Sequence, residues 1–186
     1  GQIGLSFLEN LETGRNFQYY RSCSVGSTFG PKDIDEEYIR KASAIHYSGM
    51  LLELSESMRE ACQTCVKIAR EAGVMVSFDP NIRKEVMKSD AAKQRLYEGI
   101  KNADVIAPTF EEAKFVTGLE DPLEILEELH SLGPQVIALT RDKDGAIVSD
   151  GNKVVFVEGM SVDAIDPTGA GDTFASMLIY GIQEGW

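Results

Sequence analysis

Short apolar runs alternate with longer amphipathic stretches through the middle of the chain. The runs are four or five residues long and often β-branched, which is typical of buried strands, and they cover 44–47, 74–78, 104–107 and 136–140. The stretches around them carry apolar residues three or four positions apart and predict helices over 33–42, 55–72, 89–103, 109–116 and 122–132. This alternation predicts an α/β fold with a mostly parallel sheet covered by helices.

The two ends of the chain follow a different pattern. Segments 3–9 and 17–23 alternate apolar and polar residues about a polar, glycine-bearing turn, so they predict an antiparallel hairpin. A lone hairpin is only marginally stable and must pack against other parts of a protein. Closer to the other end, apolar runs at 146–148 and 154–157 flank the turn Asp150-Gly151-Asn152 and predict a second hairpin.

The composition fits a folded protein and restricts its partners. The 186 residues are 43% hydrophobic and 26% charged, and 18 Lys and Arg against 30 Asp and Glu give a net charge of −12. This negative field argues against nucleic acid and anionic membranes as partners, and no apolar run approaches the roughly 20 residues of a membrane helix. Three cysteines do not make a disulfide framework, so we expect a reducing, cytoplasmic location. The same field should repel nucleotides and sugar acids unless local groups override it.

Ligands of open α/β sheets bind beyond the carboxyl ends of the strands, and segment 166–174 follows such an end. It reads Asp-Pro-Thr-Gly-Ala-Gly-Asp-Thr-Phe. The run Gly169-Ala170-Gly171 opens the last helix, predicted over 169–182, so converging amides and the positive helix end could hold an anion without a lysine. Asp172 is either a first-turn acid favoured by the helix dipole or a base for an attacking hydroxyl.

This nine-residue segment resembles the C-terminal signature of the ribokinase-like (PfkB) carbohydrate kinases, which use ATP and Mg²⁺. The resemblance implies that Gly169, Ala170 and Gly171 hold and stabilise the transferring γ-phosphoryl group of the nucleotide. It also implies that Asp172 is the catalytic base. Asp166 would fall near the monovalent-cation site, for K⁺, that some members possess.

Two segments upstream resemble further motifs of the same family. Segment 79–83, Asp-Pro-Asn-Ile-Arg, is by composition an ordinary turn, but it resembles the Asp-x-Asn-x-Arg motif of sugar-acid kinases and fructokinases. That resemblance implies that Arg83 binds substrate. Segment 108–113 occupies the position of the family's Asn-x-x-Glu motif, so Glu112 would act indirectly on the metal through the magnesium–phosphate network. Thr109 replaces the asparagine, and without the family Glu112 is a first-turn acid favoured by the helix dipole.

Segment 140–145 resembles the family's nucleotide loop, Thr-x-Gly-x-x-Gly. Thr140 and Gly145 match this pattern, and the resemblance implies that they contact ATP. Asp142 replaces the first glycine of the pattern.

The first hairpin carries the information on substrate. Tyr19 and Arg21 share one strand face because side chains alternate with period two, which leaves Arg21 either solvated or directed at a ligand. In the family this segment belongs to a β-sheet lid that closes over the sugar, so both residues would bind substrate. The Tyr-x-Arg run followed by Ser-Val-Gly-Ser at 24–27 is most similar to 2-keto-3-deoxygluconate kinases. A guanidinium also suits a carboxylate through paired charge-assisted bonds.

The family resemblance implies part of a β-lid hairpin at 1–29 and a ribokinase-like α/β core at 30–186, incomplete at both ends because family members are longer. We expect an ATP-dependent kinase for a primary hydroxyl of a sugar or sugar acid, most similar to a 2-keto-3-deoxygluconate kinase. A fructokinase or another sugar kinase of the family is the alternative, and a non-catalytic ligand-binding fragment is the alternative of another class. The isolated chain is expected to be weakly active or inactive. Its expected partners are the small-molecule sugar or sugar acid and ATP, with no nucleic acid or membrane, and the lid could join copies into a homo-oligomer.

Overall fold

The computed structural model describes residues 1–11, 14–82, 89–163 and 165–186. Within these residues the main sheet has the strand order β3-β4-β5-β6-β7-β8. The strands are β3 Ala44–Ser48, β4 Met75–Asp79, β5 Val105–Ile106, β6 Val136–Thr140, β7 Ala146–Ser149 and β8 Val154–Val157. Strands β3 to β6 run parallel, and β7 and β8 add an antiparallel hairpin beside β6. The expected α/β architecture is confirmed.

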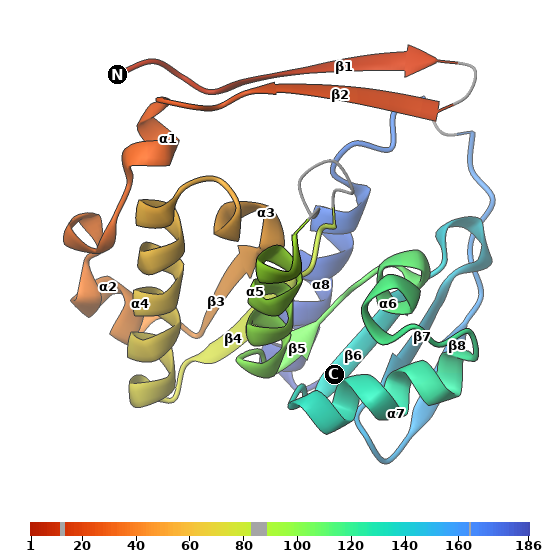
Figure 1. Cartoon of the computed structure of the whole chain (residues 1–186). Helices are drawn as coiled ribbons and strands as arrows, with labels where there is room; N and C mark the ends of the chain where they lie inside the picture. The colour runs from red at the N-terminus through yellow and green to blue at the C-terminus, as the bar shows by residue number, and fades with distance from the viewer. Residues whose placement is uncertain (12–13, 83–88, 164) are drawn as a thin grey trace.

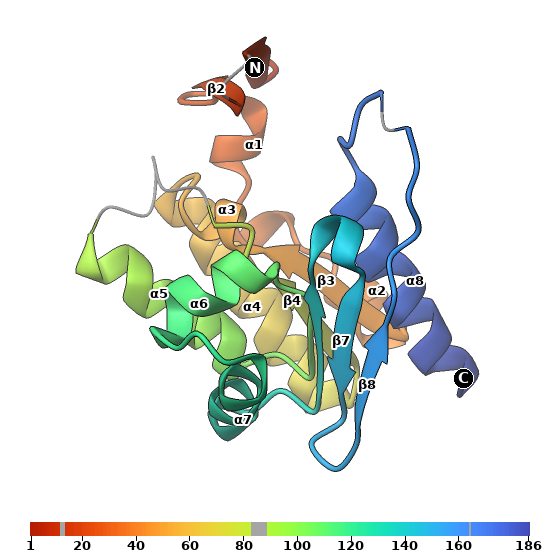
Figure 2. The same ribbon diagram turned by 90° about the vertical axis from the view of Figure 1, so that its right-hand side faces the viewer.

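Helices cover both faces of this sheet (Figures 1 and 2). One face carries α4 Glu56–Ala72, α5 Asp90–Lys101, α6 Phe110–Thr117 and α7 Pro122–Leu132. Consecutive parallel strands are neighbours in the sheet and their crossovers are right-handed, so the connecting helices fall on the same face. Helix α8, Ala170–Glu184, lies on the opposite face. Shorter helical segments are α1 Val25–Thr28, the 3-10 turn Pro31–Asp33, α2 Glu36–Lys41, α3 Gly49–Leu52 and the 3-10 turn Asp142–Asp144.

The hydrophobic core lies between the sheet and helices α4 to α7. Phe78, Ile137 and Ile147 are fully buried there. The ring of Tyr47 packs on that of Phe78, with centroids 4.8 Å apart. Gly99 of α5 makes room for the same ring, because a Cβ at this position would lie 2.5 Å from Phe78 Cζ. This packing holds α5 against β4, at whose carboxyl end a predicted site segment begins.

Capping residues mark where the helices begin and end. Ser55 caps α4 by accepting the Met58 amide at 3.0 Å, and Gly73 ends it in the left-handed region with φ 70°. The helix expected over 33–42 is shorter in the structure, because Asp35 accepts the Tyr38 amide at 3.1 Å and makes α2 start at residue 36. Helices α1 and α3 were not expected, since four residues are too few to show a periodic apolar pattern.

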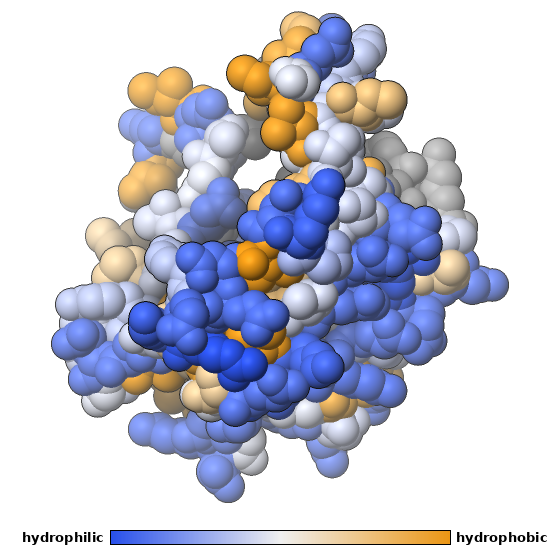
Figure 3. Space-filling view, turned by 90° about the vertical axis from the view of Figure 1, so that its left-hand side faces the viewer, coloured by the Kyte–Doolittle hydropathy of each residue, from blue (hydrophilic) through white to orange (hydrophobic). Residues whose placement is uncertain are grey.

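The expected first hairpin is confirmed as β1 Leu5–Leu11 paired antiparallel with β2 Gly14–Tyr20. It stands beyond the carboxyl ends of the parallel strands (Figure 1). Leu5, Phe7 and Tyr20 are each more than half exposed, and apolar side chains gather on this hairpin in the space-filling view (Figure 3). The division into 1–29 and 30–186 stays a prediction. Among the described residues, no helix combines the length and the apolar character that crossing a membrane requires.

Candidate active site

The N-terminus of α8 has the geometry of an anion-binding turn. Gly169 is its N-cap residue, with φ 85° in the left-handed region and no hydrogen bond from a capping side chain. The Ala170 amide is tied back into the preceding turn, and the Thr173 amide makes a helical bond to the Gly169 carbonyl at 2.9 Å. Helix geometry leaves the amides of Gly171 and Asp172, between these two, without an intrahelical acceptor. Together with the helix dipole, they form the donor set that an anion needs.

Two carboxylates border this turn. Asp166 accepts the amide and the hydroxyl of Thr168 with one oxygen, at 2.9 and 2.7 Å, and so shapes the start of the turn. Asp172 lies exposed in the first turn of α8, where a substrate hydroxyl could reach it. The potassium role of Asp166 and the catalytic role of Asp172 stay predictions.

His46 lies near this turn, although in the sequence it is only one residue of an apolar strand run with no nucleophile partner. Its Nδ1 is 3.0 Å from the hydroxyl oxygen of Ser77 on the neighbouring strand, its register partner. The atoms around the ring lower the pKa of His46 by desolvation, although the residue as a whole is exposed, while the charge of Asp172 acts in the opposite direction and raises it. The position of His46 could have been predicted from the alternation of side chains along a strand. Ile45 and Tyr47 pack on the α4 side of the sheet, so the ring of His46 between them faces the α8 side.

In the segment after β6, Asp142 stands where the family pattern has glycine, and its backbone adopts a conformation that glycine favours. The ends of this segment are joined by a hydrogen bond from the Arg141 amide to the Gly145 carbonyl at 2.8 Å. Asp142 has φ 52°, in the left-handed region that glycine favours and aspartate tolerates. Gly145 has φ 89°, and a Cβ there would overlap the carbonyl oxygen of Val157. Gly145 therefore has a packing role, and the ATP contacts of Thr140 and Gly145 stay predictions.

Helix α6 begins with a reciprocal capping box. The Glu112 amide donates to Thr109 Oγ1 at 3.2 Å, and Glu112 Oε2 accepts both the amide and the hydroxyl of Thr109 at 2.9 Å. Glu112 Oε1 accepts the Ile82 amide, 30 residues away in sequence, at 2.6 Å. The carboxylate is thus held by the backbone of two segments, and its proposed link to magnesium stays a prediction.

The segment after β4 forms the turn that its composition predicts. The Asn81 amide donates to Asp79 Oδ1 at 2.9 Å, and Asn81 has φ 39°. Asparagine is among the residues that tolerate a positive φ. Arg83, the predicted substrate residue of this segment, lies outside the described residues.

On the hairpin, Tyr19 and Arg21 lie together as predicted. The Arg21 guanidinium stacks over the Tyr19 ring, 4.5 Å from its centroid, and the Phe17 and Tyr19 rings stack at 5.9 Å. A guanidinium carries five N–H donors, so contact with a ring leaves donors for a ligand.

Hydrogen bonds connect three of the strand-end segments. The Thr140 amide donates to the Pro108 carbonyl at 3.0 Å, next to a bridge between Thr109 and Thr140, and Glu112 reaches Ile82. The N-terminus of α8 and the hairpin lie at the same end of the molecule (Figures 1 and 2). The described predicted residues therefore gather at one end of the sheet, and the hairpin stands apart from the hydrogen-bonded group.

Comparison with known proteins identifies the family of this chain. The model of the pfkB family of carbohydrate kinases matches residues 1–186. The chain belongs to the PfkB family.

Relatives of this PfkB chain are named as kinases of different sugars and sugar acids. The 2-dehydro-3-deoxygluconokinase of Bacillus subtilis is 31% identical over 90% of this chain and 52% of its own length. The probable fructokinase-6 of Arabidopsis thaliana is also 31% identical, over 96% of this chain and 47% of its own length. The chain thus spans about half the length of these curated relatives, and its similarity does not separate the two substrates.

Solved structures show the same fold. The 2-dehydro-3-deoxygluconokinase of Thermotoga maritima superposes with a TM-score of 0.88 at 25% identity, covering all of this chain and 62% of that one. A putative ribokinase II of E. coli, solved in complex with ATP and Mg²⁺, also has a TM-score of 0.88 at 26% identity, covering 98% of this chain and 58% of that one. The ribokinase-like fold expected from the sequence is confirmed.

The described residues of the PfkB chain contain no group of three His, Cys, Asp or Glu that could hold a metal ion. Magnesium commonly binds through one or two carboxylates together with substrate phosphates. In such sites the phosphates of a bound nucleotide supply most of the ligands.

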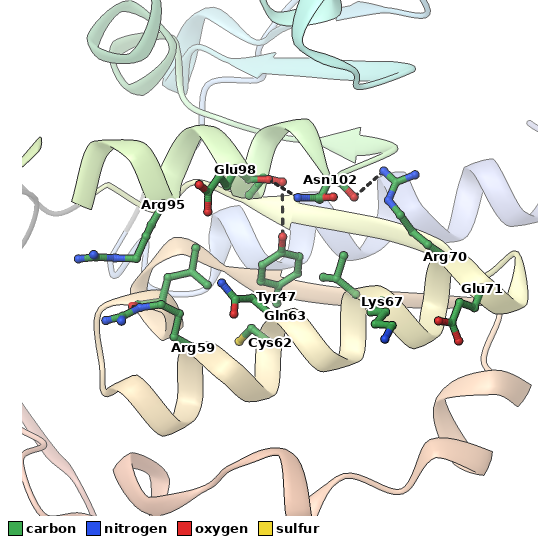
Figure 4. Close-up of a pocket in the computed structure, with 13 residues that line it drawn as sticks. Tyr47, Arg59, Cys62, Gln63, Lys67, Arg70, Glu71, Arg95, Glu98 and Asn102 are labelled. Carbon is green, nitrogen blue, oxygen red and sulfur yellow. Dashed lines mark hydrogen bonds between the residues drawn. The ribbon is translucent and has the colours of Figure 1, made fainter. Parts of the chain in front are cut away.

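A cavity of about 380 Å³ lies between α4 and α5, on the face of the sheet that α4 to α7 cover (Figure 4). Two of its cationic side chains bond to the ends of helices: Arg70 donates to the Asn102 carbonyl at 2.7 Å, and Arg59 donates to the Leu52 carbonyl at 3.0 Å. A third, Arg95, is paired with Glu53. Tyr47 forms part of its lining. Because ligands of such sheets bind beyond the strand ends, we do not place the active site in this cavity.

Proposed function

We propose that the protein carrying this chain transfers the γ-phosphoryl group of ATP to a primary hydroxyl of a sugar acid, with 2-keto-3-deoxygluconate as the substrate. The observation that carries this proposal is the turn at Gly169–Asp172. It places unpaired helix amides beside an exposed carboxylate at the ligand-binding end of the sheet. Membership of the PfkB family and relatives named 2-dehydro-3-deoxygluconokinase support it.

The residues of the turn divide the work of phosphoryl transfer. Asp172 accepts the proton of the sugar hydroxyl, which makes the oxygen a better nucleophile toward the γ-phosphorus. The amides of Gly171 and Asp172 and the positive end of α8 stabilise the charge that develops on the phosphoryl oxygens. Magnesium, when bound with ATP, neutralises charge on the β- and γ-phosphates. No lysine is needed at this turn, so a chain of net charge −12 can still hold a nucleotide.

The sugar acid is preferred over a neutral sugar because of Arg21. Its guanidinium lies over the Tyr19 ring, 4.5 Å from the centroid, and carries five N–H donors beside the hairpin. A carboxylate can accept two of these donors in a charge-assisted pair, which a neutral ketohexose cannot do. Fructose is the second candidate, because fructokinases are as similar to this chain as the sugar-acid kinases are.

The chemistry is tested by ATP consumption with 2-keto-3-deoxygluconate, fructose and ribose. We expect turnover with the sugar acid and a loss of about 10²- to 10⁴-fold in kcat for Asp172→Asn, with nucleotide binding retained. The matched control is Glu184→Gln, at an exposed acid in the last turn of the same helix, which should leave kcat unchanged. Turnover that survives in Asp172→Asn would refute the base assignment, and nucleotide binding without turnover on any sugar would favour a non-catalytic binding module.

The substrate is tested at Arg21. Arg21→Ala should raise the KM for the sugar acid by tenfold or more and leave the KM for fructose nearly unchanged, because about 1.4 kcal/mol of charge-assisted bonding is a factor of ten. Arg21→Lys should recover only part of this loss, since an ammonium lacks the planar fork. An equal effect of Arg21→Ala on both sugars would argue for the neutral substrate.

A further inference from the structure

The carboxylate of Glu112 is almost fully used by donors from two separate segments. Oε1 accepts the Ile82 amide at 2.6 Å, and Oε2 accepts the amide and hydroxyl of Thr109, both at 2.9 Å. An ionised carboxylate offers about four lone-pair positions, so three are occupied. This is more than a helix cap requires, because the Ile82 amide belongs to another part of the chain.

The segment that Glu112 reaches is under constraint. Asn81 has φ 39°, and its amide donates to Asp79. Pro80 is fully buried. A Cβ on Gly49 would overlap the carbonyl oxygen of Pro80, so the backbone at the start of α3 lies in close contact with this turn. A positive φ outside glycine persists only where surrounding contacts hold it. The far end of the turn is held by the bond from the Ile82 amide to Glu112 and by the Ile82 side chain, which packs against the core.

The other side of Glu112 leads toward the nucleotide loop. Thr109 forms a bridge with Thr140, whose amide donates to the Pro108 carbonyl at 3.0 Å. Hydrogen bonds and the Pro108–Thr109 backbone therefore connect the turn after β4, through Glu112, to Thr140 at the end of β6. In the proposed kinase, the turn after β4 continues into Arg83, and Thr140 at the end of β6 contacts ATP.

We propose that Glu112 is a positioning residue, whose carboxylate holds the Asp79–Ile82 turn against the start of α6 and so sets the geometry of sugar binding. The effect of Glu112 on sugar binding rests on the proposed function, whereas its role in holding the turn does not. It differs from a role in the magnesium–phosphate network, because the bonds of Glu112 reach backbone donors. Glu112→Gln is the informative change: a glutamine amide has only one oxygen acceptor, so it cannot accept from Ile82 and Thr109 with two different oxygens.

The structural part is tested by amide hydrogen exchange followed by NMR in this chain. Glu112→Gln should raise the exchange rate of the Ile82 amide by about tenfold or more, because a charge-assisted bond is lost. Glu111→Gln, at the exposed neighbouring acid of the same helical turn, is the matched control and should leave Ile82 unchanged. Thr109→Ala should disturb the start of α6 while Ile82 stays protected. Unchanged protection of Ile82 in folded Glu112→Gln would overturn the proposal.

The catalytic part is tested by separating KM values. Glu112→Gln should raise the KM for the sugar by about tenfold while the dependence of the rate on magnesium concentration stays as in the parent protein. A shifted magnesium dependence with an unchanged sugar KM would overturn the positioning role in favour of the metal network. If the parent protein shows no kinase activity, the proposed function fails and the exchange measurement still decides whether Glu112 holds the turn.

Discussion

Gly145 passes so close to Val157 that a methyl group on its Cα would overlap the Val157 carbonyl oxygen. The contact joins the loop after β6 to the end of β8, which pairs with β7 and not with β6. It explains why this loop keeps glycine at its last position, whereas at position 142 an aspartate adopts φ 52° without such crowding. Packing and backbone conformation require the glycine independently of any nucleotide.

Gly145→Ala should therefore destabilise the protein by about 3 kcal/mol, from a strained φ of 89° together with the overlap. Gly151→Ala is the matched control. It also has a positive φ, 83°, but a Cβ there meets nothing closer than 3.8 Å, so about 1 kcal/mol is expected. Urea unfolding followed by circular dichroism measures both values. Equal losses would show that strain alone, and not the contact with Val157, accounts for the glycine.

The second prediction concerns the contact of Gly99 with Phe78. Gly99→Ala should destabilise by about 1–3 kcal/mol, although alanine is the better helix former, because the new methyl group would lie 2.5 Å from the Phe78 ring. Phe78→Leu removes the obstructing ring. In that background Gly99→Ala should be neutral or stabilising, which gives a coupling energy of about 1 kcal/mol or more in a double-mutant cycle. Additive losses would contradict this explanation.

The third prediction uses the two histidines of the chain, His46 and His130, as NMR probes. The pKa of His46 is lowered by desolvation, and Asp172 partly offsets this. Asp172→Asn should lower the His46 pKa further, since the raising charge is lost. Titration of the ring resonances measures the change, with His130→Gln to assign them. An unchanged or raised His46 pKa in Asp172→Asn would contradict the coupling between β3 and the proposed base.

The same lowered pKa predicts how stability depends on pH. Between the folded pKa of His46 and its ordinary value of 6.5, the unfolded chain binds more protons than the folded one. The contribution of His46 is therefore fully present above that range and is lost as the pH falls through it. His46→Gln should flatten this part of the profile, measured by urea unfolding at several pH values from 7.5 to about 5. An equally steep profile in the variant would assign the dependence to other groups.

The fourth prediction concerns the ion pair between Arg95 and Glu53. Two hydrogen bonds of 2.6 Å join them, with the Glu53 side chain only 9% exposed. Glu53→Gln should cost about 2 kcal/mol, because it removes the charge that pairs a partly buried guanidinium. The control is Glu37→Gln, which breaks the exposed pair with Lys41 and should cost less than about 0.5 kcal/mol. Comparable losses in the two variants would show that the burial of Glu53 adds nothing.

Local chemistry explains which parts of the fold could be predicted. Helix α7 and strand β6 match their predicted bounds of 122–132 and 136–140, because Pro122, Gly133 and the apolar run mark their limits within a few residues. The helix expected over 33–42 was too long, because the pattern did not show that Asp35 is a cap. Capping depends on backbone conformation at one residue, and apolar periodicity is insensitive to it.

The candidate site also has parts that the sequence predicts and parts that it does not. Gly169–Asp172 and the pairing of Tyr19 with Arg21 could be read from neighbouring residues, since a helix start and a strand face are local features. The bond between Glu112 and Ile82 spans 30 residues, and His46 meets Ser77 across 31. Such contacts depend on which strands are neighbours and in what register, and no spacing in the chain encodes that directly.

The sequence by itself determined the alternation of strands and helices along the chain, the glycine turn before α8 and the family motif, because each depends on residues a few positions apart. Only the tertiary structure decided that Glu112 fastens the turn after β4, that Gly145 must stay small beside Val157 and that His46 lies on the face shared with α8. The physical reason is that the sheet brings distant strand ends together. Short-range bonding preferences are set along the chain, whereas the partner of each group is set by packing in three dimensions.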